Sequence, residues 1–162
     1  MDKRIWIACD HGGYELKVKL LDFFRREEIE FNDIGCNSSE IVRYPYYAAE
    51  VASRISRGEI ERGILICSTG IGMSIMANKY PGVRASLCHT VYEARMTRAH
   101  NNSNCLCLGG RIIGDFQAIE LVKEWMAGTY EGGRHDISLG LISEAEQMNL
   151  SGRCWVNTAP LK

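Results

Sequence analysis

The sequence predicts an α/β protein built on a parallel sheet. Short apolar runs of strand length alternate at least four times with segments whose apolar residues recur at helical spacing. Residues 63–79 show the unit most clearly, because a strand, a glycine-containing turn and the start of a helix follow one another without a break. Such alternation is typical of a parallel sheet covered by helices on both faces.

The length of 162 residues suits one domain. No internal repeat, low-complexity segment or linker divides it. We expect a single domain over residues 1–149 and a tail over residues 150–162, which has no periodicity but carries Trp155.

The first third of the chain is expected to form strands at residues 4–9 and 29–34 and helices at residues 14–28 and 46–58. Apolar residues share one side of the first helix, whereas Lys17 and Lys19 are expected elsewhere on it. Gly35 ends the second strand, and the polar loop over residues 36–45 suits a position above a site. Gly58 closes the second helix.

The central strand is expected at Ile64 to Ile66, and it leads into a turn from Cys67 to Gly72. A helix over residues 71–80 follows and is stopped by Pro81 and Gly82. This geometry leaves several backbone N–H groups unpaired and pointing the same way. Such groups suit a phosphate, a carboxylate or a developing oxyanion.

The remaining elements repeat the pattern. We expect strands at residues 84–88 and 105–108, helices at 91–100, 115–127 and 138–149, and a glycine-rich loop at 128–136.

Composition excludes several classes of protein. A net charge of -1 argues against a nucleic-acid binder with a broad basic face. No apolar run approaches the roughly 20 residues that span a bilayer, and the N-terminus lacks the apolar core of a signal peptide. The seven cysteines show no CxxC or zinc-site spacing, so reduced thiols in a cytoplasmic protein without a metal are the simplest interpretation.

Polar groups follow three predicted strands, and the carboxyl ends of parallel strands share one edge of a sheet. These polar groups are Asp10 and His11 after the first strand, the turn that begins at Cys67 after the third, and Arg111 after the fifth. Asp10 and His11 equally suit a turn and helix cap. A free cysteine is more often a buried packing residue, but a helix start after Cys67 favours its thiolate, which is a usable base or nucleophile.

The other titratable residues carry weaker signals. His100 lies at a helix end, where a cation is favourable without any function, and His89 is expected in a loop. Arg111, Arg134 and His135 lie in glycine-rich stretches, where they are either exposed to solvent or suited to a phosphate.

Six segments in register resemble the ribose-5-phosphate isomerase B family, which includes allose- and galactose-6-phosphate isomerases. They are CDHGGYELK (9–17), YPYYA (44–48), GILICSTGIGMSIMANK (63–79), RMTRAHNNSN (95–104), LGGRIIG (108–114) and YEGGRH (130–135). The resemblance covers about residues 4–148. It implies a Rossmann-like three-layer α/β/α sandwich with a five-stranded parallel sheet, and a homodimer or dimer of dimers whose active sites lie between subunits.

The resemblance also implies a metal-free and cofactor-free aldose–ketose interconversion through a cis-enediolate, as in the pentose phosphate pathway. Cys67 would move the proton between C1 and C2. Thr69 would assist proton movement between the oxygens, and the enediolate would be stabilised by the N–H groups of Ser68, Thr69, Gly70, Ile71 and Gly72. His100 of the neighbouring subunit, with Asp10, would open the sugar ring. The phosphate would be held by His11, Arg111 and Arg134, and the sugar would be contacted by Tyr44 and Asn101.

The chain departs from the family pattern at positions that could face the substrate. Arg43 stands where members usually have aspartate, and Ser138 stands where many have a second phosphate arginine. We expect Arg43 to change or replace part of the anion contact. Met73 stands where a cysteine-less branch has its glutamate, so the thiol branch fits better.

Two alternatives remain open at the level of sequence. One is the same reaction on another sugar phosphate, such as allose 6-phosphate, galactose 6-phosphate or a tetrose phosphate. The other is a non-catalytic module that binds a phosphorylated metabolite. The second would explain the glycine turn and the arginines but not the joint presence of Cys67, Thr69, Asp10 and His100.

Overall fold

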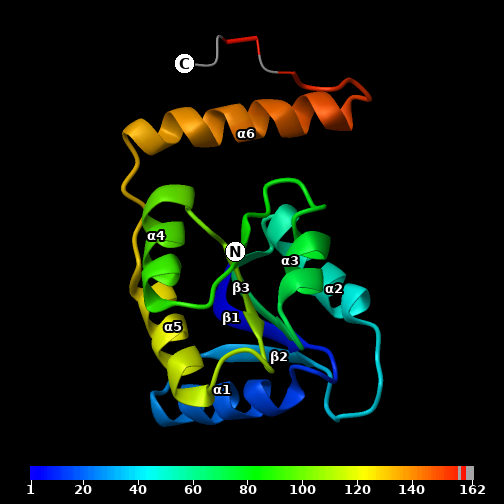
Figure 1. The fold of residues 1–162 in the computed structure, drawn as a ribbon, viewed down its shortest axis with the longest axis vertical. Helices are drawn as coiled ribbons and strands as arrows, with labels where there is room; N and C mark the ends of the chain where they lie inside the picture. Colours follow the sequence, from blue (N-terminus) through cyan, green and yellow to red (C-terminus); the bar gives the residue numbers. More distant parts are fainter. Residues whose placement is uncertain (157, 160–162) are drawn as a thin grey trace. The chain divides into compact units, whose positions relative to one another are not determined.

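Five parallel strands form the sheet at the centre of residues 1–130 (Figure 1). They are β1 (Asp2–Cys9), β2 (Phe31–Gly35), β3 (Ile60–Cys67), β4 (Ala85–Leu87) and β5 (Cys105–Gly109), in the order β2-β1-β3-β5-β4. The computed structural model describes residues 1–156, 158 and 159, which fall into two units divided after Tyr130. The predicted α/β class and five-stranded parallel sheet are confirmed.

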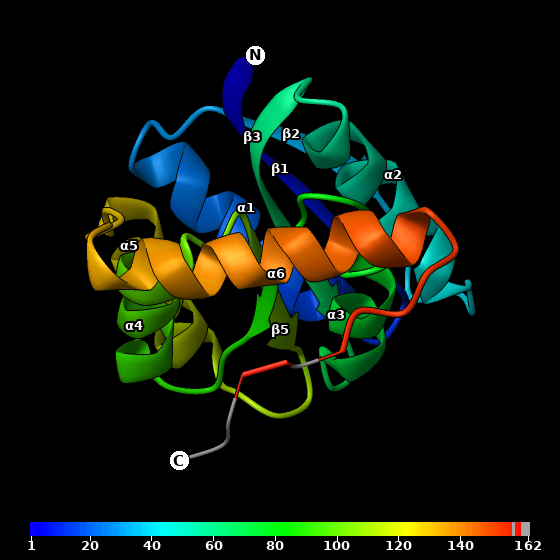
Figure 2. The same ribbon diagram turned by 90° about the horizontal axis from the view of Figure 1, so that it is seen from above.

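Helices cover both faces of this sheet, as Figures 1 and 2 show from two directions. One face carries α1 (Tyr14–Arg26), α4 (Val91–Asn101) and α5 (Asp115–Ala127), and the other carries α2 (Tyr44–Ser56) and α3 (Ile71–Ala77). Leu20, Phe24 and Trp125 are fully buried on the first face, whereas Val51 and Met73 are fully buried on the second. The result is the predicted three-layer sandwich.

The side chains of strand β3 alternate between the two faces of the sheet. Ile64 and Ile66 belong to the core under α1 and α5, whereas Leu65 and Cys67 belong to the core under α2 and α3. This is the two-residue alternation of a strand buried on both faces. The Cys67 side chain therefore lies on the α2/α3 side of the sheet.

Several predicted boundaries were wrong. Helix α2 begins at Tyr44 rather than at residue 46, because Pro45 suits the first helical turn, where its missing N–H costs nothing. Strand β3 begins at Ile60, well before the predicted Ile64. Helix α3 ends at Ala77 rather than at residue 80, and the other boundaries differ by a few residues.

The unit after Tyr130 consists of α6 (Arg134–Leu150) and the chain that follows it. Arg134 and His135 thus lie in a helix and not in the predicted loop. The Trp155 N–H donates to Asn149 Oδ1 over 3.2 Å, which ties the first part of the predicted tail to this helix. Residues 157 and 160–162 of that tail lie outside the described residues.

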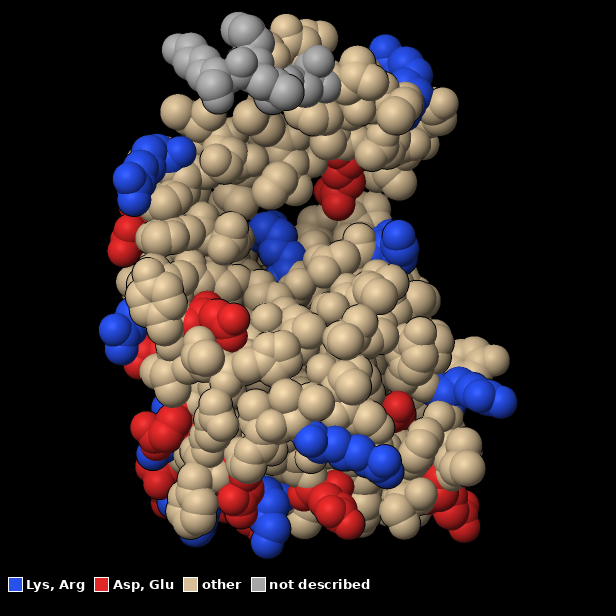
Figure 3. Space-filling view, viewed as in Figure 1, with Lys and Arg blue, Asp and Glu red and all other residues tan. Residues whose placement is uncertain are grey.

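Basic and acidic side chains are interspersed on the face drawn in Figure 3. Among the described residues, no helix is both long and apolar enough to cross a membrane.

Candidate active site

The loops that follow β1, β3 and β5 meet at the carboxyl edge of the sheet. A Cβ added at Gly12 would lie 2.0 Å from Ser68 Oγ, so the loop after β1 presses directly on the turn after β3. The Gly110 N–H donates to the Cys67 carbonyl over 2.8 Å, and the Arg111 N–H donates to the Ser68 carbonyl over 3.0 Å. Three segments far apart in the sequence therefore form one surface.

Cys67 is the last residue of β3, and its side chain contacts the turn that follows. The Gly70 N–H lies 3.1 Å from Cys67 Sγ and donates to it. Gly70 adopts a φ of 77°, in the left-handed region that glycine tolerates best, and this conformation aims its N–H back at the sulfur. The hydrogen bond fixes the Cys67 sulfur beside the turn.

The turn keeps fewer N–H groups available than the sequence predicted. The Gly70 N–H is engaged by Cys67, and the Ile71 N–H donates to Thr69 Oγ1 over 3.3 Å. The N–H groups of Ser68, Thr69 and Gly72 make no hydrogen bond with the described residues. Local side chains therefore satisfy the N–H groups of Gly70 and Ile71 in this structure, and their role toward an enediolate stays a prediction.

Asp10 is 6% exposed, and its Oδ1 accepts the N–H groups of Gly12 (2.8 Å) and Gly13 (3.2 Å). It therefore caps the turn before α1 with one carboxylate oxygen, which matches the structural interpretation of this residue. Its Oδ2 makes no hydrogen bond with the described part of the chain.

His11 is oriented by the loop that precedes α2. The Val42 N–H donates to His11 Nδ1 over 3.3 Å. Because Nδ1 accepts, the ring proton is assigned to Nε2, which leaves an N–H donor on the far side of the ring.

Lys17 is an anchoring residue that the sequence analysis placed wrongly. Its side chain is 1% exposed, and Nζ donates to both carboxylate oxygens of Asp33 (2.6 and 2.8 Å) and to the Cys36 carbonyl (2.7 Å). These bonds tie α1 to the start of the loop over residues 36–43. The signal was present, because Lys17 lies three, four and seven residues before Leu20, Leu21 and Phe24 on the buried stripe.

Tyr44, Arg43 and Arg111 border the turn after β3. A Cβ added at Gly72 would lie 2.8 Å from the Tyr44 ring, so the ring rests on the backbone of the turn. The guanidinium groups of Arg43 and Arg111 make no hydrogen bond or ion pair with the described residues, and both side chains are exposed. Both are therefore available to an anion.

His100 and Asn101 lie at the other edge of the sheet. They end α4, and the nearby Asn104 carbonyl accepts the Gly63 N–H at the beginning of the β3–β5 pairing. Cys67 pairs with Gly109, four residues further along these strands, which corresponds to about 13 Å. Residues 1–130 therefore do not bring His100 or Asn101 to Cys67, and Arg134 belongs to the separate unit.

Three other thiols in the sheet region differ from Cys67 in their surroundings. Burial raises the pKa of Cys88 to about 12, and it also raises the pKa of Cys9. The pKa of Cys107 is raised as well, chiefly by its contact with Cys105 and by complete burial. These three groups are held as thiols at neutral pH, which is consistent with packing residues.

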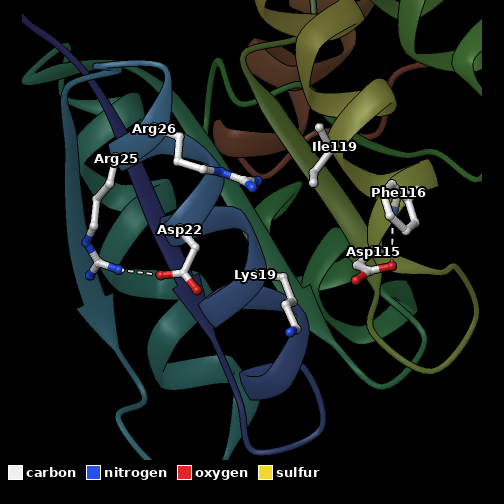
Figure 4. A pocket seen from close by; sticks show the side chains of 7 residues that line it. All are labelled: Lys19, Asp22, Arg25, Arg26, Asp115, Phe116 and Ile119. Carbon is white, nitrogen blue, oxygen red and sulfur yellow. Dashed lines mark hydrogen bonds and ion pairs between the residues drawn. The ribbon is translucent and has the colours of Figure 1, made fainter.

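A pocket of about 530 Å³ lies elsewhere, between α1 and α5 (Figure 4). Its lining is formed by Lys19, Asp22, Arg25, Arg26, Asp115, Phe116 and Ile119. Arg25 pairs with Asp22 over 2.7 Å, and Asp115 Oδ1 accepts the Phe116 N–H. None of the predicted site residues lines it.

Comparison with known proteins agrees with this geometry. The family model Ribose/Galactose Isomerase matches residues 5–142. Ribose-5-phosphate isomerase B of Escherichia coli is 42% identical over 90% of this chain and 97% of its own. D-erythrulose-4-phosphate isomerase of Pectobacterium atrosepticum is 38% identical over 80% of this chain and 86% of its own.

Solved structures give the same result. Ribose-5-phosphate isomerase B of Clostridium thermocellum superimposes with a TM-score of 0.86 at 44% identity, over 89% of this chain and 97% of the other. The Mycoplasma genitalium enzyme with bound ribulose-5-phosphate gives a TM-score of 0.84 at 34% identity, over 91% of this chain and 98% of the other.

A parallel α/β sheet with a hydrogen-bonded thiol at its carboxyl edge, together with these likenesses, defines an enzyme of the aldose–ketose isomerase class. Within that class, the chain belongs to the Ribose/Galactose Isomerase family. The resemblance stated from the sequence is thereby confirmed.

Proposed function

We propose that this enzyme interconverts ribose 5-phosphate and ribulose 5-phosphate, with Cys67 as the catalytic base. The observation that carries the proposal is the Gly70 N–H donated to Cys67 Sγ over 3.1 Å, where three strand-end loops meet. The named activity of the Escherichia coli relative and the ribulose-5-phosphate bound to the Mycoplasma genitalium relative support this choice of substrate.

The reaction moves one proton between adjacent carbons. The Cys67 thiolate removes the proton from C2 of the open-chain aldose, and the electron pair forms the C1–C2 double bond while the C1 carbonyl oxygen gains negative charge. Return of the proton to C1, and transfer of the O2 proton to O1, yields the ketose. A positioned base is needed because a carbon acid beside a carbonyl is weak at neutral pH.

The turn supplies the second requirement, which is stabilisation of the enediolate oxygens. The N–H groups of Ser68, Thr69 and Gly72 are the donors left over after Gly70 and Ile71 are engaged. Preorganised donors of this kind are often the largest single contribution to catalysis. The Thr69 hydroxyl, which accepts the Ile71 N–H, keeps its own proton to pass between O1 and O2.

Three basic side chains would hold the phosphate. His11 offers its Nε2–H because Val42 occupies Nδ1, and Arg111 has an exposed guanidinium without a partner among the described residues. Arg134, which begins α6, is the third phosphate ligand that the family resemblance implies. Guanidinium groups bind phosphate oxygens in pairs, which orients the substrate as well as holding it.

Ring opening would require a second copy of the chain. His100 and Asn101 end α4 at the edge of the sheet opposite Cys67. A homodimer that places the partner's α4 end over the Cys67 edge would bring His100 to the sugar ring and Asn101 to its hydroxyl groups. Asp10 Oδ2, which makes no hydrogen bond with the described residues, would then accept a hydrogen bond from the partner's His100.

A different sugar phosphate is the second candidate substrate. The Pectobacterium atrosepticum relative acts, by its name, on D-erythrulose 4-phosphate, so the family accepts more than one sugar. In this chain Arg43, which immediately precedes Tyr44, is the residue best placed to alter the choice.

The test is turnover and solvent-proton exchange of the purified enzyme on ribose 5-phosphate, allose 6-phosphate, galactose 6-phosphate and erythrose 4-phosphate. We expect ribose 5-phosphate to give the highest kcat/KM. We expect Cys67→Ala to lose about 10²- to 10⁴-fold in kcat while it still binds substrate, because a positioned base contributes that much. Cys154→Ala, which removes the exposed thiol, is the matched control.

Each outcome is decisive. A higher kcat/KM on another sugar would replace the substrate, and turnover by Cys67→Ala would remove the thiol from the mechanism. Binding of every sugar phosphate without turnover by the unaltered enzyme would favour the phosphometabolite-binding module.

A further inference from the structure

Two cysteines that the proposed reaction does not use lie against each other at the carboxyl ends of β1 and β2. Cys9 is the last residue of β1, and Cys36 directly follows β2. Their Sγ atoms are 3.7 Å apart, and both residues are buried and reduced. The pair therefore joins the end of a central strand to the beginning of the loop over residues 36–43.

The backbone holds the two cysteines at a separation that a disulfide can span. The Cys36 N–H donates to the Cys9 carbonyl over 2.9 Å, and the preceding residues, Ala8 and Gly35, are partners in the two strands. Neighbouring strands lie about 4.7 to 4.9 Å apart, within the roughly 4.4 to 6.8 Å between the Cα atoms of bonded cysteines. The sulfur atoms have to approach from 3.7 Å to about 2.05 Å, which side-chain rotation and a small shift of the chain at Cys36 supply.

The two sulfur atoms have different surroundings. Cys36 is 4% exposed and is followed by the exposed residues 37–41, whereas Cys9 has no exposed surface. Burial raises the pKa of Cys9, so this group stays a thiol until its neighbour reacts. The Lys17 charge opposes the rise, because the Lys17 ammonium and the Cys9 thiol both donate to the Cys36 carbonyl, over 2.7 and 3.8 Å. Cys36 is therefore the sulfur that an oxidant meets first.

We propose that Cys9 and Cys36 form a redox-sensitive pair, which a hydroperoxide converts to a disulfide that lowers isomerase turnover. The Cys36 sulfur attacks one peroxide oxygen, the O–O bond breaks, and the second oxygen leaves as water with the thiol proton, so that Cys36 becomes a sulfenic acid. The Cys9 sulfur then attacks the Cys36 sulfur, the S–O bond breaks as the S–S bond forms, and the hydroxyl group leaves as water with the Cys9 proton. The two thiols lose two electrons and the peroxide gains them.

The disulfide acts on the part of the site that would hold the phosphate. Cys9 lies two residues before His11, and Cys36 begins the loop whose Val42 N–H donates to His11 Nδ1 over 3.3 Å. Pulling the start of this loop toward the end of β1 changes how Val42 meets the His11 ring. A displacement of about 1 Å can cost about 10²-fold in rate. This effect on turnover rests on the proposed function, whereas formation of the disulfide does not.

Tryptic peptides report the disulfide directly. Trypsin cleaves after lysine and arginine, so it releases residues 5–17 and 27–43 as separate peptides with one cysteine each. The reduced full-length protein is treated with hydrogen peroxide, its free thiols are capped with N-ethylmaleimide, and it is digested without reductant. Mass spectrometry should then find the two peptides joined, and dithiothreitol should separate them. Oxidation of Cys154, the exposed thiol, shows that the peroxide has acted.

Turnover of the preferred sugar phosphate measures the effect on the site. Peroxide should lower the kcat/KM of the unaltered enzyme at least about ten-fold, and dithiothreitol should restore it. Because Cys67 can also be oxidised, the same dose is given to Cys36→Ser and Cys9→Ala, which keep Cys67 but cannot form the disulfide. Each should retain at least about ten times the kcat/KM that remains in the treated unaltered enzyme. Cys88→Ser, which removes a buried thiol outside the pair, should stay as sensitive as the unaltered enzyme.

Three results would overturn the proposal: peptides that stay unlinked after Cys154 has been oxidised, a disulfide that leaves kcat/KM unchanged, or equal losses in the unaltered enzyme and both variants. The last result would assign the inactivation to Cys67. If Cys9→Ala does not fold, Cys36→Ser decides the question, because Cys36 adjoins the exposed residues 37–41. Inactivity of the reduced enzyme on every sugar phosphate would refute the proposed function instead, and the linked peptides would still decide whether the pair is oxidised.

Discussion

At the scale of single residues, position distinguishes chemically identical side chains. Cys88 and Cys107 are buried thiols whose pKa is raised, whereas Cys67 accepts a backbone N–H at the end of β3. The Gly70 N–H holds the Cys67 sulfur beside the turn. Of these three cysteines, only Cys67 therefore combines a donor to sulfur with a place at the carboxyl edge.

Arg43 is the residue we expect to tune substrate preference. It is exposed, has no partner among the described residues, and immediately precedes Tyr44, whose ring rests on Gly72. Arg43→Asp should lower kcat/KM on the preferred sugar phosphate about ten-fold, mostly through KM, which corresponds to about 1.4 kcal/mol of lost attraction to the phosphate.

Steady-state kinetics on the four-sugar panel measure this effect. Arg26→Asp makes the same charge change away from the Cys67 edge and serves as the control. Unchanged kinetics of Arg43→Asp on every sugar would exclude Arg43 from the anion contact.

At the scale of secondary structure, α1 is joined to the start of the loop over residues 36–43 through Lys17. Lys17→Met keeps much of the volume but leaves Asp33 and the Cys36 carbonyl without their donor. Removing one partner of a buried ion pair costs about 3 to 5 kcal/mol, but Asp33 is 25% exposed. We therefore expect a loss of about 2 kcal/mol in the free energy of unfolding.

Urea denaturation measures this loss. Lys19→Met, an exposed position on the same helix, should change the free energy of unfolding by less than about 0.5 kcal/mol. Equal stability of the two variants would show that the Lys17 bonds contribute nothing net.

Helix α4 is fixed at its beginning by a capping box. The Glu93 carboxylate accepts the N–H groups of His89 (2.7 Å) and Thr90 (2.9 Å), and these bonds lower the pKa of Glu93 from its ordinary 4.5. A lowered pKa contributes stability above 4.5 that is lost as the pH falls through the folded-state value. Glu93→Gln should cost about 1 kcal/mol at neutral pH and progressively less in acid.

Thermal or urea unfolding between neutral pH and pH 3 tests this dependence. Glu120→Gln, an exposed position on α5, is the control. A difference between Glu93→Gln and the unaltered protein that stays constant down to pH 3 would contradict the capping role of the carboxylate.

At the scale of the whole molecule, the proposed dimer makes a prediction that no monomeric site can meet. Cys67→Ala and His100→Ala should each be inactive on the closed sugar, but their mixed dimer contains one site with both native residues. When subunits exchange at random, about half of the dimers contain one subunit of each variant. Each of these mixed dimers has one intact site out of two, so about a quarter of the native activity should return.

The experiment refolds the two variants together and measures turnover. Cys67→Ala mixed with the double variant Cys67→Ala/His100→Ala has no intact site and should remain inactive. Failure of the first mixture to recover activity, with mixed dimers present, would place His100 and Cys67 in the same subunit or remove His100 from the reaction.

The sequence by itself determined the class of fold and the central turn. The alternation of apolar periods depends on near neighbours along the chain, so it can be recognised without a structure. The turn from Cys67 to Gly72 was predicted for the same reason, since a strand, glycines and a helix start are adjacent in the sequence.

Only the tertiary structure decided which groups meet. Strand order and register bring the Gly12 loop against Ser68, bury Lys17 beside Asp33, and place Val42 on the ring of His11. They also place the end of α4 at the edge opposite Cys67. These contacts join residues far apart in the chain, and their positions depend on packing of the whole sheet rather than on local pattern.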